Sequence, residues 1–159
     1  YEFQTLLGDR AVARGFDNKA GLFIVAETLR LIKEEGGLSD GVGVYAVGTV
    51  QEEIGSRGAR TSAFGIGAQS GLAVDMEHAI DYPGVSKAQY GELDLGKGPS
   101  ISRSANTNPV VFDLIRRAAL EESIPYQVQA TGGTTPTDAN AMQINGSGMA
   151  TGLLGVPLR

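Results

Sequence analysis

The chain has 159 residues, of which 42% are hydrophobic and 19% charged, a composition typical of a globular domain rather than a disordered segment. Its net charge of −5 disfavours binding to nucleic acid or to an anionic membrane surface. Because the sequence contains no cysteine, disulfides, thiolate nucleophiles and thiolate metal sites are excluded. No apolar run is long enough to span a bilayer and no signal segment opens the chain. We therefore expect a cytoplasmic protein with no nucleic-acid or membrane partner.

The first half of the chain predicts two helices and two strands. After an extended opening, apolar residues recur at helical spacing from Asn18 to Glu35, with Asp17 or Asn18 able to cap this helix. The valine-rich segment Val42 to Val50 predicts a strand buried on both faces. A short helix from about Ala59 to Phe64 follows, and Gly71 to Asp75 reads as another short strand that ends on a carboxylate.

The second half alternates helices with strands. Turn residues dominate Ile80 to Ser104 and indicate turns between short strands. The remaining elements are a helix at Pro109–Glu122 with Asn108 as N-cap, a strand at Tyr126–Ala130, a glycine-rich loop at Thr131–Thr137, a short helix at Asp138–Ile144 entered through Asp138, and a buried strand at Met149–Leu158. This alternation predicts an α/β fold of three layers, αβα, around a largely parallel central sheet.

Four carboxylates are the candidate functional residues. In parallel sheets ligands bind beyond the C-terminal ends of strands, and we expect Glu52, Glu53 and Asp75 to lie at such ends, with Asp17 at the start of the first helix. Of the adjacent pair, one can ligate a metal while the other handles a proton. Converging carboxylates would repel one another without a cation, whereas divalent ions would make the cluster favourable.

Each of these residues also has a plainer interpretation. Asp17 could be only a helix N-cap, and Glu52 with Glu53 only a solvated strand end. His78, the single histidine, is a possible ligand but more often such a residue is exposed or neutral and hydrogen-bonded. The loop Thr131–Thr137 lacks the lysine and spacing of a P-loop, and a flexible surface loop and an active-site role are about equally supported there.

Four sequence blocks, spread over nearly the whole chain, carry a family resemblance. They are, in order, Ala13-Arg-Gly-Phe-Asp17-Asn-Lys-Ala-Gly21; Thr49-Val-Gln-Glu52-Glu53-Ile-Gly-Ser-Arg57-Gly58-Ala59; Gly71-Leu-Ala-Val-Asp75 with Asp81-Tyr-Pro-Gly84 and Leu95-Gly-Lys-Gly-Pro99; and Thr137-Asp-Ala-Asn-Ala-Met-Gln-Ile-Asn145 with Val156-Pro-Leu-Arg159. A single block would be weak evidence, but the ordered set is specific. It resembles the glutamyl and tetrahedral (TET) aminopeptidases, two-metal exopeptidases related to the co-catalytic zinc leucyl aminopeptidases and sometimes labelled endoglucanases or cellulases.

The resemblance implies a role for each candidate carboxylate. Asp17 would bridge two divalent metal ions, zinc or cobalt, while Glu53 and Asp75 would each bind one of them. Glu52 would be the general acid and base. The implied reaction is removal of N-terminal residues from peptides with a free N-terminus by metal-activated water, which agrees with the chemistry that carboxylates and paired metals can perform.

The resemblance also implies what lies outside this chain. The family has a phosphorylase/hydrolase-like zinc-peptidase fold, of which residues 1–159 would be one part of a single catalytic domain, incomplete at both ends. Two histidine ligands and an inserted oligomerisation domain of the family have no counterpart here, and Lys19 stands where the family usually has arginine. Family members assemble into homo-oligomers from dimers to dodecamers, so we expect this of the full-length protein.

Two other functions remain open from the sequence. The absence of the histidine ligands leaves room for a non-catalytic binding or assembly subunit. Glycoside hydrolysis also uses two carboxylates, but they must flank the scissile bond at about 5 to 9.5 Å. Neighbouring Glu52 and Glu53 do not suit that arrangement, although Glu52 with Asp75 could, and the sequence has no tryptophan for a sugar-binding platform.

Overall fold

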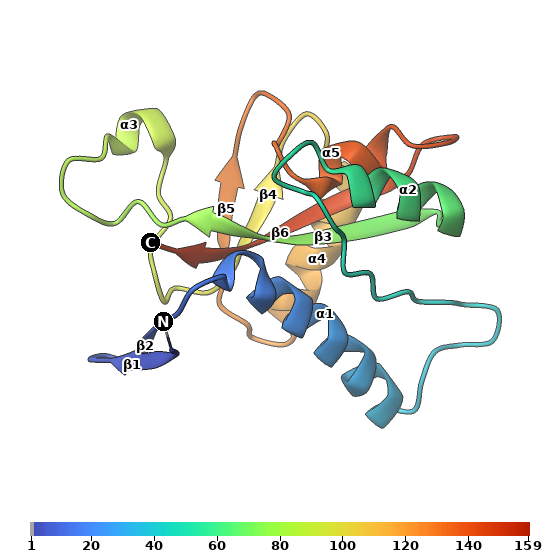
Figure 1. Ribbon diagram of the computed structural model, residues 1–159, viewed down its shortest axis with the longest axis horizontal. Helices are drawn as coiled ribbons and strands as arrows, with labels where there is room; N and C mark the ends of the chain where they lie inside the picture. Colours follow the sequence, from blue (N-terminus) through green and yellow to red (C-terminus); the bar gives the residue numbers. More distant parts are fainter. Residues whose placement is uncertain (1) are drawn as a thin grey trace. The chain divides into compact units, whose positions relative to one another are not determined.

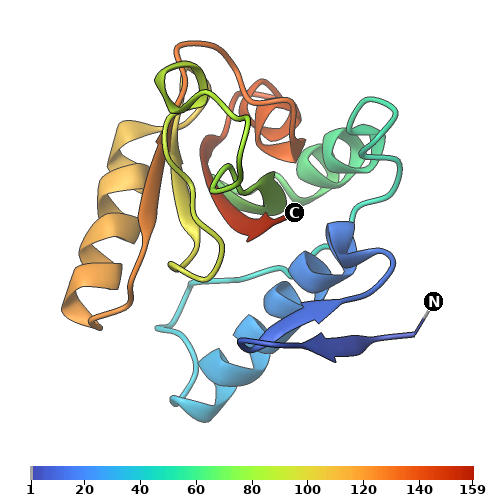
Figure 2. The same ribbon diagram turned by 90° about the vertical axis from the view of Figure 1, so that its left-hand side faces the viewer.

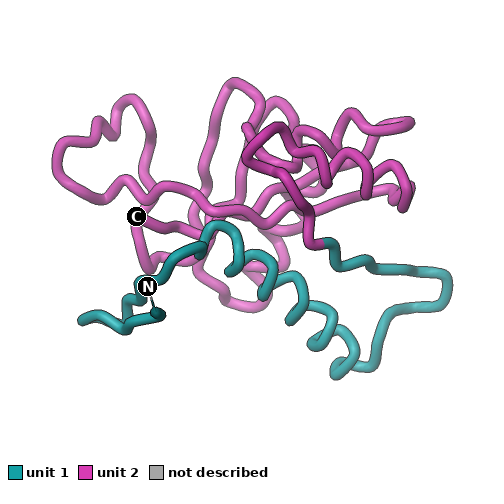
Figure 3. Tube along the Cα trace, in the orientation of Figure 1, with its two compact units in different colours: residues 1–47 teal, residues 48–159 magenta. Residues whose placement is uncertain are grey.

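The computed structural model describes residues 2–159, and the chain divides into two compact units, residues 1–47 and 48–159 (Figure 3). The first unit contains β1 (Gln4–Leu6), β2 (Arg10–Val12) and α1 (Phe16–Glu34). The strands β1 and β2 pair antiparallel as a hairpin where only an extended opening was predicted. The loop of this hairpin places Gly8 and Asp9 at φ values of 74° and 57°. This is a left-handed conformation that glycine and aspartate adopt more readily than other residues.

The predicted first helix is confirmed as α1. The side chain of Asn18 accepts a hydrogen bond from the Gly21 N–H at 2.9 Å, so Asn18 supplies the cap. At the other end, the Gly37 N–H donates to the Ile32 carbonyl at 2.8 Å, and Gly37 has a φ of 85°. A glycine in this conformation ends the helix without a steric penalty.

The predicted strand Val42–Val50 is wrong. This segment forms no strand pairing with the described part of the chain, and all of its residues except Val47 are exposed. Valine-rich composition favours a strand only where a partner strand supplies the hydrogen-bond ladder and a packed surface covers the side chains. Neither condition holds for residues 42–50 in the structure.

The second unit is built on a four-stranded sheet in the order β3-β6-β4-β5 (Figure 1). Its strands are β3 (Ser70–His78), β4 (Ser100–Arg103), β5 (Gln127–Ala130) and β6 (Ala150–Leu158). β3 pairs parallel with β6 along nine residues, β4 pairs parallel with β5, and β4 pairs antiparallel with β6. The predicted largely parallel sheet is therefore confirmed, with one antiparallel junction in its interior.

Four helices accompany this sheet: α2 (Arg57–Ile66), α3 (Lys87–Tyr90), α4 (Pro109–Glu121) and α5 (Asp138–Gln143). Among them α3 was missed, because its four residues are too few to show a helical period. α4 begins as predicted, with the Asn108 side chain accepting hydrogen bonds from the N–H groups of Val110 at 2.9 Å and Val111 at 3.2 Å. None of the helices among residues 2–159 combines the length and the apolar character needed to cross a membrane.

The helices α4 and α5 cover opposite faces of the sheet (Figure 2), which gives the predicted three layers within this unit. Small residues allow the close approach. A Cβ atom added to Gly152 of β6 would lie 2.7 Å from Val111 Cγ1 and 3.1 Å from Ile115 Cδ1 of α4. On the other face, Ala73 of β3, Leu153 of β6 and Ala139 of α5 form a buried cluster. Alternation of side chains along β6 therefore sends neighbouring residues into different layers.

Candidate active site

Glu52 and Glu53 lie on a tight turn rather than at the end of a strand, which corrects the predicted position of the pair. The Glu52 carbonyl accepts hydrogen bonds from the N–H groups of Gly55 and Ser56, both at 2.9 Å. The flanking residues Gln51 and Ser56 have φ values of 60° and 52°. Such left-handed conformations in non-glycine residues are uncommon and cluster at functional sites.

The start of α2 closes this turn through a contact between backbones. The Gly58 N–H donates to the Val50 carbonyl at 2.9 Å. A Cβ atom at Gly58 would collide with the backbone N of Val50 and lie 2.6 Å from its carbonyl oxygen. Backbone atoms cannot move aside as the end of a flexible side chain can, so only glycine permits α2 to begin directly against the turn.

The turn forms one wall of a cavity of about 340 Å³ in the second unit. Glu52 and Glu53 line it from the turn. Thr137 lines it from the position just before α5, and Asn140 lines it from within α5. Arg60 contributes from α2. The structure thus brings the predicted pair together in one cavity, with donor groups from separate elements that the sequence prediction did not include.

Two hydrogen bonds hold the elements around this cavity together. The Thr49 hydroxyl donates to Asp138 Oδ2 at 2.6 Å, which ties the segment before the turn to α5. Asn145 Nδ2 donates to the Arg60 carbonyl at 2.5 Å, which ties the residues after α5 to α2. The second oxygen of Asp138, Oδ1, is buried and has no hydrogen-bond partner among the described residues. The N-cap of α5 is Thr137 rather than the predicted Asp138.

Asp75 lies within β3 and does not end it, because the strand continues to His78. Its Oδ1 accepts a hydrogen bond from the Met76 N–H at 2.8 Å. Two residues further, burial raises the pKa of the Glu77 carboxyl above its usual range, although a hydrogen bond from the Ser100 hydroxyl acts in the opposite direction. His78 is exposed at the end of the strand.

Asp17 belongs to the first unit, while Glu52, Glu53 and Asp75 belong to the second. Asp17 has φ −84° and ψ 106°, outside the helical region, and Asn18 supplies the cap of the helix. The N-cap interpretation of Asp17 is therefore not supported. Residues 2–159 contain no group of three or more histidine, cysteine, aspartate or glutamate side chains placed to hold a metal ion.

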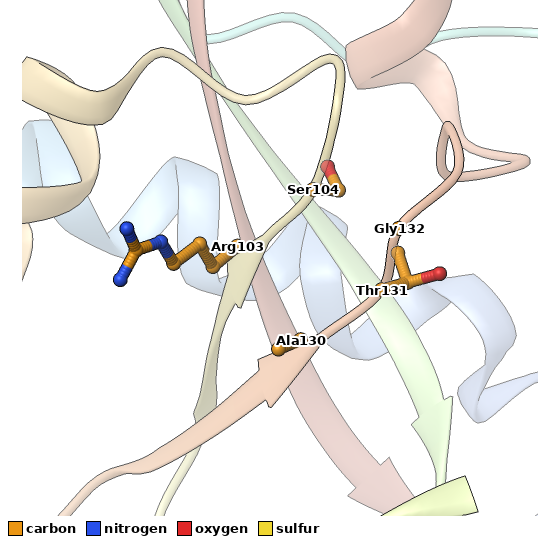
Figure 4. A pocket seen from close by; sticks show the side chains of 5 residues that line it. All are labelled: Arg103, Ser104, Ala130, Thr131 and Gly132. Carbon is orange, nitrogen blue, oxygen red and sulfur yellow. The ribbon is translucent and has the colours of Figure 1, made fainter. Parts of the chain in front are cut away.

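A second cavity of about 410 Å³ lies at the ends of β4 and β5 and contains none of the predicted site residues. It is lined by Arg103, Ser104, Ala130, Thr131 and Gly132. The Arg103 side chain points away from the Thr131 hydroxyl (Figure 4), and its guanidinium lies 5.8 Å from the centre of the Phe112 ring. The polar groups that line this second cavity therefore do not point toward a common space.

The chain is similar to known proteins over nearly its whole length. The family described as M42 glutamyl aminopeptidase matches residues 1–159. Lysyl aminopeptidase from Pyrococcus furiosus is 35% identical over 157 residues, which are 99% of this chain and 43% of that protein. Aminopeptidase APDkam598 from Desulfurococcus kamchatkensis has a TM-score of 0.84 at 34% identity, covering 98% of this chain and 43% of that one.

A further solved structure is the TET1 peptidase of Pyrococcus horikoshii, described as able to assemble into a tetrahedron or a large octahedral shell. It has a TM-score of 0.72 at 26% identity, covering 98% of this chain and 44% of that one. The present chain spans less than half the length of these relatives. On the match of its full length to the family and on these likenesses, the chain belongs to the M42 glutamyl aminopeptidases.

Proposed function

We propose that this chain carries part of the catalytic centre of a metal-dependent aminopeptidase that acts on peptides with a free N-terminus. The observation that carries the proposal is the placement of Glu52 and Glu53 in one cavity of a chain that belongs to an aminopeptidase family. The lysyl aminopeptidase of Pyrococcus furiosus supports the same reaction class. The hypotheses of a non-catalytic subunit and of a glycoside hydrolase gain no comparable support.

Family membership implies use of a divalent metal, and the donor chemistry of the candidate residues fits one. In our proposal Asp17, Glu53 and Asp75 would be the carboxylate ligands of two divalent ions, zinc or cobalt. When bound, such ions lower the pKa of water and polarise a carbonyl group. Three carboxylates alone make a poor zinc site, since zinc usually takes nitrogen or sulfur donors, so the proposed centre also needs imidazole ligands.

Glu52 is proposed as the general acid and base. A carboxylate in this role accepts a proton from the attacking water and passes it to the departing amine. Its neighbour Glu53 is left for ligation, so the two adjacent residues divide proton transfer from metal binding. The turn that fixes the Glu52 backbone through two hydrogen bonds supports this division, because it places both residues on the lining of the same cavity.

The same resemblance supports a homo-oligomer for the full-length protein. The TET1 peptidase of Pyrococcus horikoshii is described as assembling into a closed tetrahedral or octahedral particle. We propose that the full-length protein assembles from dimers up to a dodecamer. Light scattering on the purified full-length protein measures this directly, and a monomer at micromolar concentration would contradict it.

The test of the proposed reaction is Glu52→Gln in the full-length protein. Glutamine keeps the shape of the side chain, but its amide cannot act as a general base. We expect release of N-terminal residues to fall by roughly 100- to 10,000-fold, the range typical for loss of a general base. Metal content per chain, counted by elemental mass spectrometry, should stay at the wild-type value.

Glu121→Gln is the matched control, because Glu121 is an exposed glutamate at the end of α4. This variant should keep wild-type turnover and metal content. Wild-type rates in Glu52→Gln would refute the role of Glu52. Absence of aminopeptidase activity from the metal-loaded wild-type protein would refute the proposed function as a whole.

A further inference from the structure

A buried polar network connects the loop after β4 to the glycine-rich loop. Asn106 is 1% exposed and Thr135 is 7% exposed, so neither side chain relies on water for its hydrogen bonds. The Thr135 N–H donates to Asn106 Oδ1 at 2.8 Å, and Asn106 Nδ2 donates to Thr135 Oγ1 at 3.0 Å. The Thr151 hydroxyl, fully buried on β6, donates to the Asn106 carbonyl at 2.9 Å. Thr135 is therefore fixed from both its backbone and its side chain.

The direction of these hydrogen bonds is determined by their chemistry. A backbone N–H can only donate, so the atom of the Asn106 amide that faces the Thr135 N–H must be the oxygen. The Ser104 hydroxyl donates to the same oxygen at 2.9 Å. The remaining atom of the amide is the nitrogen, which donates to Thr135 Oγ1. Thr135 Oγ1 is thus an acceptor in this contact.

The contact between Asn106 and Thr135 also determines which hydroxyl donates in the contact between Thr135 and Thr137. The two oxygens, Thr135 Oγ1 and Thr137 Oγ1, lie 3.1 Å apart, and the geometry alone permits either to donate. A hydroxyl carries one hydrogen. Thr135 is buried, and Thr137 Oγ1 is the one acceptor that its hydroxyl contacts among the described residues, so its own hydrogen must go to Thr137 to avoid a buried unpaired donor. The hydrogen of the Thr137 hydroxyl is consequently left for another acceptor.

Thr137 does not use this hydrogen, or its oxygen, to cap the helix. It is the N-cap residue of α5, yet it makes no side-chain cap hydrogen bond. It lines the cavity that contains Glu52 and Glu53. A threonine at this position usually caps the helix, so its hydroxyl is used differently here.

We infer that Thr137 is a substrate-binding residue that donates a hydrogen bond to a carbonyl oxygen of the bound peptide. Ser104, Asn106 and Thr135 act as positioning residues for this donor. The inference rests on the proposed aminopeptidase function. The N-terminal ammonium group of a peptide is a donor and suits the carboxylates of the cavity, whereas its carbonyl oxygens are acceptors and need a donor such as Thr137.

The first experiment compares Thr137→Val with Thr137→Ser in the full-length protein, by steady-state release of the N-terminal residue from a tripeptide. Valine keeps the shape of the side chain without the hydroxyl, while serine keeps the hydroxyl. We expect kcat/KM to fall roughly 3- to 10-fold in Thr137→Val, as for loss of one hydrogen bond, and to stay within about twofold of wild type in Thr137→Ser.

Thr134→Val is the matched control, since Thr134 is exposed on the same loop. It should leave kcat/KM unchanged. A wild-type kcat/KM in Thr137→Val, or an equal loss in Thr137→Ser, overturns the inference. Failure of the wild-type protein to release any residue refutes the proposed function and the inference with it, whereas an active wild type with an unaffected Thr137→Val overturns the inference alone.

A second experiment reverses the direction of the network with Asn106→Asp. An aspartate carboxylate only accepts, so the Thr135 hydroxyl would donate to it and Thr137 would donate to Thr135. We expect kcat/KM to fall as in Thr137→Val, with no further loss when the two changes are combined. Additive losses would overturn the positioning role of Asn106. If Asn106→Asp does not fold, the comparison of Thr137→Val with Thr137→Ser decides the inference.

Discussion

The cavity at Glu52 and Glu53 and the cavity at Arg103 and Thr131 differ in a way that their volumes do not show. The cavity at Arg103 and Thr131 is larger, about 410 Å³ against about 340 Å³ for the cavity at Glu52 and Glu53. In the smaller cavity, side chains from a turn, a loop and two helices line a common space, and hydrogen bonds tie these elements together. In the larger one, Arg103 points away from its neighbours (Figure 4). Convergence of polar groups from separate elements, more than volume, identifies a site.

The largest expected difference comes from adding one methyl group to Gly58, which lies in the first turn of α2 beside the smaller cavity, or to Gly132, which lines the larger one. Gly58→Ala forces a Cβ atom into the backbone of Val50, while a Cβ atom at Gly132 meets nothing within 4 Å. We expect Gly58→Ala to lose about 1 to 3 kcal/mol of unfolding free energy, as overpacking does, and most aminopeptidase activity. Gly132→Ala should keep both. Denaturant unfolding and turnover of the two variants measure this, and equal behaviour would remove the distinction between the cavities.

A smaller difference is expected from replacing one threonine beside each cavity by valine. Thr49→Val removes the hydroxyl that donates to Asp138 and should lower the unfolding free energy by about 1 kcal/mol. In the other cavity, exposed Thr131 accepts only a long 3.4 Å hydrogen bond from the Gly133 N–H. Thr131→Val should therefore be close to neutral in urea unfolding. A larger loss in Thr131→Val than in Thr49→Val would show that the larger cavity is the better supported one.

The smallest effect is expected on α4, next to the larger cavity. Hydrogen bonding to Arg116, with a further contribution from Arg117, lowers the pKa of the half-exposed Asp113 carboxyl. A lowered folded-state pKa gives stability that is present above the ordinary carboxyl value and is lost as the pH falls through the lowered value. Asp113→Asn should therefore have a slightly lower unfolding free energy than wild type in urea unfolding at about pH 7. This difference in unfolding free energy should disappear below about pH 3. A gap that widens on acidification would contradict this assignment.

Local signals in the sequence predicted the regular elements well. Helical spacing with an Asn108 cap predicted α4, and the apolar run before Leu158 predicted β6. These features depend on residues close together in the chain. Val42–Val50 failed because a strand depends on a partner elsewhere, which valine content does not reveal. The hairpin at Gly8 and Asp9 was missed although its residues carry a turn signal.

The candidate site was predicted only in part. The expected place at a strand end singled out Glu52 and Glu53, family resemblance gave them roles, and the structure places both in one cavity. Their assigned roles, and those of Asp17 and Asp75, stay predictions. The hydroxyl network around Asn106 and Thr135 had no local signal beyond a loop rich in threonine, because its hydrogen bonds join segments far apart in the chain. Such contacts follow from the packing of β4 against β5 and could not be deduced from spacing.

The position of β6 has a consequence for how the second unit acquires its structure during synthesis. β6 is the last strand of the unit in chain order, yet it lies between β3 and β4. Until residues 150–158 have left the ribosome, β3 and β4 have no strand between them. The sheet on which α4 and α5 pack is then without its second strand, β6. Long-range pairings of this kind form late and leave apolar strands uncovered in the nascent chain. Truncation before Ala150 should therefore give a chain that recruits chaperones during translation rather than a smaller folded unit.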